Sequence, residues 1–110
     1  MMASLSTHVL DTSHGCPAAG VALRLLDGDG AMLFAAATDA DGRCPGLPAL
    51  AQGRYRLEFA VAPYFAGRGV DLPDPPFLDI IVLDFGIADE AHYHVPLLVS
   101  PYGYSTYRGS

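Results

Sequence analysis

Apolar and polar residues alternate with a period of two over most of the chain. The pattern is clearest over residues 54–59, where Tyr55, Leu57 and Phe59 alternate with charged side chains. Successive side chains of a strand point to opposite faces, so this segment is predicted to be a strand with one buried and one solvated face. The same pattern predicts further strands over residues 4–11, 21–26, 31–38, 81–87, 91–100 and 102–108.

Turn-forming residues separate these segments at intervals of about 8–12 residues, which is typical of β-sandwiches. Residues 27–30, Asp-Gly-Asp-Gly, predict a hairpin turn between two strands. One short helix is expected over about residues 63–69, and the proline-rich residues 71–76 are expected to form a stiff loop. Because Pro96 has no backbone N–H, its strand is expected to have a free side or a bulge there. These features predict an all-β sandwich.

Composition indicates a single domain, residues 1–110, with one hydrophobic core. The chain is 51% hydrophobic, which is rich for its size, so self-association is expected. Its formal charge is −6 and its basic residues are not clustered, which argues against nucleic acid as a partner. No apolar run approaches the roughly 20 residues of a membrane span, and the first residues do not show the basic-then-apolar pattern expected of a leader. We therefore expect no membrane partner and a cytoplasmic location.

Histidines supply the first candidate chemistry. His8 lies in the first predicted strand, and His92 and His94, two residues apart, project to one face of another. Three histidines from two strands could ligate zinc. They could equally act as metal-free acid and base groups near neutral pH. The spacing alone does not decide between these two.

The second candidate group combines Arg43 with the end of the chain. Arg43 follows a polar, turn-like stretch, from which a guanidinium could grip a planar polar ligand. The chain ends on a run rich in tyrosine, arginine and serine, which suggests a site built partly from the terminus itself. The two cysteines lack metal or redox spacing and are expected to be ordinary thiols.

Three blocks of residues stand out: Leu-Ser-Thr-His-Val-Leu-Asp at 5–11, Asp41-Gly42-Arg43, and His-Tyr-His-Val-Pro-Leu-Leu at 92–98 with Tyr107-Arg108-Gly109-Ser110. Together they resemble the 5-hydroxyisourate hydrolase family, the transthyretin-like proteins of purine degradation. The resemblance covers essentially the whole chain. One difference falls before residue 81, where Phe77-Leu78-Asp79-Ile80-Ile81 stands in place of the common Phe-Pro-Glu-Ile.

The resemblance implies a transthyretin-like β-sandwich of two four-stranded sheets with one short helix. It also implies a homotetramer, a dimer of dimers, whose active sites lie in a central channel and are shaped by more than one subunit. The implied reaction is hydrolysis of 5-hydroxyisourate to 2-oxo-4-hydroxy-4-carboxy-5-ureidoimidazoline in urate degradation, without metal or other cofactor. The implied catalytic residues are His8, Arg43, His94 and Ser110, and the implied substrate-binding residues are His8, Arg43, Tyr107, Arg108, Gly109 and Ser110.

Opening a lactam needs an activated water, stabilisation of negative charge on the carbonyl oxygen and a proton for the leaving nitrogen. Either His8 or His94 could be the base, and Arg43 could orient the ring and offset the developing charge. Three other classes remain: a transthyretin-like carrier of small aromatic ligands, a zinc hydrolase that uses His8, His92 and His94, and a structural sandwich module. A carrier needs an open apolar channel, which these polar residues disfavour.

Overall fold

The structure, a computed structural model, describes residues 2–109 of the chain. Its strands form two four-stranded sheets, ordered β10-β9-β2-β3 and β5-β4-β6-β7, and a parallel pair of β1 and β8. The elements are β1 (Ser4–Ser6), β2 (Val9–Asp11), β3 (Cys16–Pro17), β4 (Ala22–Asp27), β5 (Met32–Ala37), β6 (Gly53–Ala60), α1 (Val61–Gly67), β7 (Ile80–Ile87), β8 (His92–His94), β9 (Leu97–Ser100) and β10 (Gly103–Thr106).

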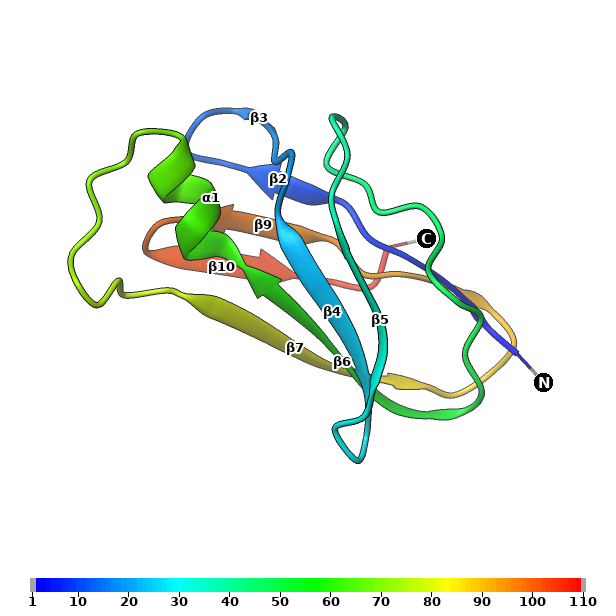
Figure 1. Ribbon diagram of the computed structural model, residues 1–110. Helices are drawn as coiled ribbons and strands as arrows, with labels where there is room; N and C mark the ends of the chain where they lie inside the picture. The colour runs from blue at the N-terminus through cyan, green and yellow to red at the C-terminus, as the bar shows by residue number, and fades with distance from the viewer. Residues whose placement is uncertain (1, 110) are drawn as a thin grey trace.

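The two sheets lie in two layers with the hydrophobic core between them (Figure 1). Leu57 and Phe59 of β6 are fully buried, and they are joined from the other sheet by Val9, Leu97 and Val99. Alternate residues of β2, β6 and β9 therefore face the core, as the period of two predicts. The predicted sandwich of two four-stranded sheets with one short helix is confirmed.

Two of the predicted strands are interrupted. Residues 4–11 form β1 and β2, and residues 91–100 form β8 and β9. The register is continuous across both breaks, since Ser6 pairs with His94 and Val9 pairs with Leu97. Pro96 lies at the break and donates no backbone hydrogen bond, so the parallel ladder stops there and resumes one residue later. The expectation for Pro96 is thus met by a gap in the pairing.

Helix α1 begins at Val61, two residues earlier than expected, and ends at Gly67. The carbonyl oxygen of Asp79 accepts hydrogen bonds from the first two helical N–H groups, those of Val61 and Ala62. Proline is tolerated within the first turn, so Pro63 does not mark the beginning of the helix. Gly69, with a left-handed φ of 83°, follows its end.

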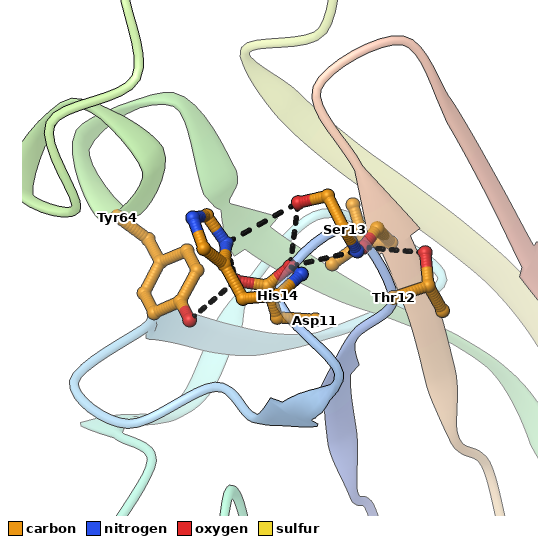
Figure 2. Close-up of polar contacts among 6 residues, drawn as sticks. Asp11, Thr12, Ser13, His14 and Tyr64 are labelled. Atoms are coloured by element: carbon orange, nitrogen blue, oxygen red, sulfur yellow. Dashed lines mark hydrogen bonds and ion pairs between the residues drawn. The ribbon is translucent and has the colours of Figure 1, made fainter.

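A buried carboxylate ties α1 to β2 (Figure 2). Asp11 accepts hydrogen bonds from the Tyr64 hydroxyl at 2.8 Å, from the ring Nδ1 of His14 at 2.6 Å and from the Ser13 hydroxyl at 2.8 Å. Burial alone raises the pKa of Asp11, but the hydrogen bonds from Ser13, Tyr64 and His14 outweigh it and lower the pKa below its ordinary value. The helix is therefore anchored by an ionised side chain.

Within the described residues, no helix is both long enough and apolar enough to cross a membrane.

Candidate active site

His8 and Arg43 lie on neighbouring segments at the break between β1 and β2. Their backbones form an isolated antiparallel bridge. Asp39 stabilises the turn that presents Arg43, because its Oδ1 accepts hydrogen bonds from the backbone N–H groups of Asp41 at 2.9 Å and Arg43 at 3.0 Å. Gly42 has a left-handed φ of 74°, and a Cβ there would collide with the backbone of β2. The turn is thus docked tightly beside the histidine.

The tautomer of His8 is fixed by a backbone carbonyl. Its Nε2 lies 2.8 Å from the carbonyl oxygen of Asp41. A carbonyl oxygen can only accept a hydrogen bond, so Nε2 carries the proton. In the neutral ring the Nδ1 atom is then left with a lone pair, which can accept a proton or a hydrogen bond.

His94 is half-buried and is held at two points. Its carbonyl oxygen accepts a hydrogen bond of 2.8 Å from the backbone N–H of Gly109, and its Nδ1 lies 2.8 Å from the Ser6 hydroxyl. The last described residue is therefore packed directly against the imidazole. A Cβ at Gly109 would lie 2.6 Å from the Cδ2 atom of His94, closer than real Cβ contacts come.

The pKa of His94 is lowered from its ordinary value. Burial is the largest cause, followed by the positive charge of Arg43 and then by His8 and His92. These groups therefore act on one another electrostatically, although they are far apart along the chain. The lowered pKa keeps the His94 imidazole neutral, and able to accept a proton, at neutral pH.

Tyr107 and Arg108 line a neighbouring groove rather than the histidine cluster. The groove, of about 240 Å³, runs between β7 and the end of β10. The Cζ atom of Arg108 lies 4.0 Å from the centre of the Tyr93 ring, and Tyr93 points to the opposite side of β8 from His94. The Tyr107 side chain is 58% exposed. Ser110 lies outside the described residues.

The histidine cluster lies on an open surface of the single chain. His8 and His94 are half-buried and Arg43 is exposed. A cavity of about 350 Å³ occurs elsewhere, beside Arg54 and Arg56, and none of the cluster lines it. In one chain by itself, the cluster is therefore packed against protein on one side and open to solvent on the other.

The three-histidine zinc site is not formed by the part of the chain that the structure describes. No group of three or more His, Cys, Asp or Glu side chains among residues 2–109 could hold a metal ion. His92 is held by two serines instead, since its Nδ1 and Nε2 atoms contact the hydroxyls of Ser4 and Ser6, at 2.5 and 2.8 Å. Both of its ring nitrogens are thus already engaged.

Known proteins resemble this chain over nearly its whole length. A family model described as "HIUase/Transthyretin family" matches residues 5–109. The chain belongs to this family. It is 52% identical to a 5-hydroxyisourate hydrolase of Caulobacter vibrioides, over 99% of this chain and 100% of the relative. A solved 5-hydroxyisourate hydrolase of Klebsiella pneumoniae is 39% identical with a TM-score of 0.86, over 99% of this chain and 100% of the other. Sea bream transthyretin in complex with thyroxine is 31% identical with a TM-score of 0.85, over 96% and 93%.

The family match includes His8, Arg43 and His94. The sequence did not indicate the partners that hold this cluster. Ser6 contacts the rings of both His92 and His94, yet the sequence pattern only placed it in the predicted strand over residues 4–11. A local signal does exist, since serines at positions 4 and 6 match the two-residue spacing of the histidines. This match becomes meaningful only once β1 is known to pair with β8, because the paired residues lie 88 positions apart in the sequence.

Proposed function

We propose that residues 1–110 form one catalytic domain that hydrolyses 5-hydroxyisourate to 2-oxo-4-hydroxy-4-carboxy-5-ureidoimidazoline, a step of urate degradation. The observation that carries this proposal is that strand pairing brings together His8, Arg43 and His94, which come from three distant parts of the chain. The 52% identity to a relative named as this hydrolase, over nearly the whole chain, supports the same activity.

In the proposed reaction His94 is the base that takes a proton from the attacking water. Its lowered pKa keeps it unprotonated at neutral pH, and general bases of this kind contribute roughly 10²–10⁴-fold. The guanidinium of Arg43 offsets the negative charge that develops on the lactam oxygen. His8 orients the substrate, because its bare Nδ1 can accept a hydrogen bond from a ring N–H.

The end of the chain completes the site in this proposal. Gly109 packs against His94, so the last described residue borders the proposed position of the substrate. Tyr107 and Arg108 line the neighbouring groove, and their proposed binding role rests on their place next to Gly109 in the chain. We assign Ser110 a catalytic role together with the histidines, and the other three residues a role in binding.

We further propose that the protein assembles as a homotetramer, a dimer of dimers. Strand β10 is exposed at the edge of its sheet, and β7 lies at the edge of the other sheet beside the same groove. Edges of this kind pair readily with a second copy. A further copy would cover the open histidine cluster and exclude water from it. Light scattering should give four times the 11.6 kDa mass of one chain.

The direct test supplies freshly generated 5-hydroxyisourate and follows its ultraviolet decay with and without the protein. The wild type should accelerate the decay, and Arg43→Gln should lower turnover by about 10²-fold, the effect of one lost charge-stabilising group. Arg54→Gln is the matched control, because Arg54 is exposed on the other sheet. Decay at the uncatalysed rate, or equal loss in both variants, would refute the proposal.

Two alternatives give different results in the same assay. A carrier of small aromatic ligands would bind thyroxine and leave the decay of 5-hydroxyisourate unchanged. The polar groups of His8, Arg43 and His94 disfavour an apolar ligand at the histidine cluster. A zinc hydrolase would lose activity after treatment with a chelator, whereas the proposed mechanism predicts full activity. The cytoplasmic location stays a prediction from the sequence.

A further inference from the structure

Four side chains form a continuous line of hydrogen bonds from His94 toward the edge of the molecule. The Nδ1 atom of His94 lies 2.8 Å from the Ser6 hydroxyl, and that hydroxyl lies 2.8 Å from the Nε2 atom of His92. On the far side of the second ring, Nδ1 of His92 lies 2.5 Å from the Ser4 hydroxyl. The line runs from half-buried His94 and Ser6 to exposed His92 and Ser4.

The parallel pairing of β1 and β8 produces this line. Ser4 is in register with His92, and Ser6 is in register with His94. Residues two apart in a strand point to the same face, so the two hydroxyls and the two imidazoles alternate along one face of the pair. The roles proposed for His8, Arg43 and the end of the chain do not involve Ser4, Ser6 or His92.

The hydroxyl of Ser6 has one proton and contacts a nitrogen of each ring, so it donates to one ring and accepts from the other. If it donates to His92, then Nδ1 of His94 carries a proton, and neutral His92 must be protonated at Nδ1 as well. If it donates to His94, both neutral rings are protonated at Nε2 instead. Ser6 therefore forces the two imidazoles into the same tautomer.

We infer that Ser6 and His92 are positioning residues of a proton relay that serves His94. In the arrangement with both rings protonated at Nδ1, the Nε2 atom of His94 is bare. When it takes a proton from water, its Nδ1 proton passes to the Ser6 oxygen and the Ser6 proton passes to Nε2 of His92. The Nδ1 proton of His92 passes to Ser4, whose own proton leaves to solvent. Both imidazoles then end neutral and protonated at Nε2, and both serine hydroxyls again carry one proton.

This relay rests on the proposed function and matches its proton balance. Hydrolysis of a neutral lactam forms a C–O bond, breaks the C–N bond and transfers one water proton to the leaving nitrogen. The new carboxyl group ionises at neutral pH, so a second proton must leave the site. The line of side chains provides a route for it. After product release, the same groups return to the first tautomer by the reverse movement or through solvent exchange.

Nitrogen-15 spectra of histidine-labelled protein test the coupling without any substrate. At a pH where both rings are neutral, His92 and His94 should show the same tautomer. In Ser6→Ala this agreement should be lost, and in Ser6→Thr, which keeps a hydroxyl, it should return. Opposite tautomers in the wild type would overturn the inference. If the tautomers agree but the wild type leaves 5-hydroxyisourate unchanged, the proposed function fails and the coupling stands.

Kinetics test whether the coupling serves the reaction. Ser6→Ala should lower kcat about tenfold with KM within twofold, because the residue acts through His94 and does not contact substrate. His92→Phe should give a similar loss, and Ser6→Thr should recover most of the activity. Ser100→Ala is the matched control, since Ser100 is a half-buried strand serine whose hydroxyl bonds only a carbonyl outside this line. Wild-type kcat in either Ser6→Ala or His92→Phe would overturn the relay.

Discussion

Replacing Gly109 by alanine tests how closely the end of the chain must approach His94. The added Cβ would lie 2.6 Å from Cδ2 of the imidazole, and 3.1 Å from both Cβ and Cγ. Gly109 does not have a positive φ, so alanine is not strained by its backbone conformation. The whole effect of the substitution therefore comes from contact with the ring.

The size of the effect follows from these distances. Carbon atoms in contact normally lie about 3.5–4.0 Å apart, so the ring or the chain end must move by about 1 Å. Movement of the chain end would break the 2.8 Å hydrogen bond from Gly109 to the His94 carbonyl, and movement of the ring would displace the proposed base. A misplacement of about 1 Å can cost about 10²-fold in rate. We expect Gly109→Ala to lower kcat by roughly that factor.

The measurement is the ultraviolet decay of freshly generated 5-hydroxyisourate at saturating substrate. Gly103→Ala is the matched control, because a Cβ there meets only the Ser100 hydroxyl, at the ordinary distance of 3.8 Å. It should keep wild-type kcat, and thermal unfolding should show that both variants fold. A kcat for Gly109→Ala within threefold of the wild type would refute the reasoning, since the predicted collision would then have no consequence.

Three further predictions concern charge and hydrogen bonding. Tyr64→Phe removes the 2.8 Å hydrogen bond to the Asp11 carboxylate and should lower the free energy of unfolding by about 1.5–3 kcal/mol. Urea denaturation measures this change, and Tyr102→Phe, at an exposed position, should leave the free energy of unfolding unchanged. Because the pKa of Asp11 is lowered in the folded state, its stabilisation is present above the unfolded pKa of about 3.9 and is lost as the pH falls through the folded value. Asp11→Asn should therefore destabilise the protein at pH 7, and its difference from the wild type should shrink below about pH 4. His94 must be neutral to act as a base, and the charge of Arg43 helps to lower its pKa, so Arg43→Gln should move the acid limb of kcat to higher pH. An acid limb that stays in place or moves down would contradict this.

The histidine cluster shows why fold and function are separate questions in this family. Sea bream transthyretin, whose solved structure holds thyroxine, shares the sandwich at a TM-score of 0.85. The proposed activity depends instead on a few polar side chains at the break between β1 and β2 and at the end of the chain. His8 and His94 flank that break, and their side chains are held by specific hydrogen bonds that the sandwich fold alone does not supply.

Local patterns in the sequence were enough to predict most elements of the fold. The period of two identified β6 and β7 almost to their ends, and the Asp-Gly-Asp-Gly turn joined β4 to β5 as expected. These features depend on which face of a short segment is buried and on the backbone freedom of glycine, and both are properties of neighbouring residues. The beginning of α1 was missed by two residues because the carbonyl of distant Asp79 caps its first turn.

Only the tertiary structure decided what surrounds each histidine. The sequence by itself determined that His92 and His94 share a strand face, because that follows from their spacing. It did not determine that Ser4 and Ser6 stand opposite them, or that Gly109 touches the second ring. Alternation describes one strand at a time, whereas strand partners and register result from packing the whole core. The pairing of β1 with β8 therefore had to be observed in the folded chain.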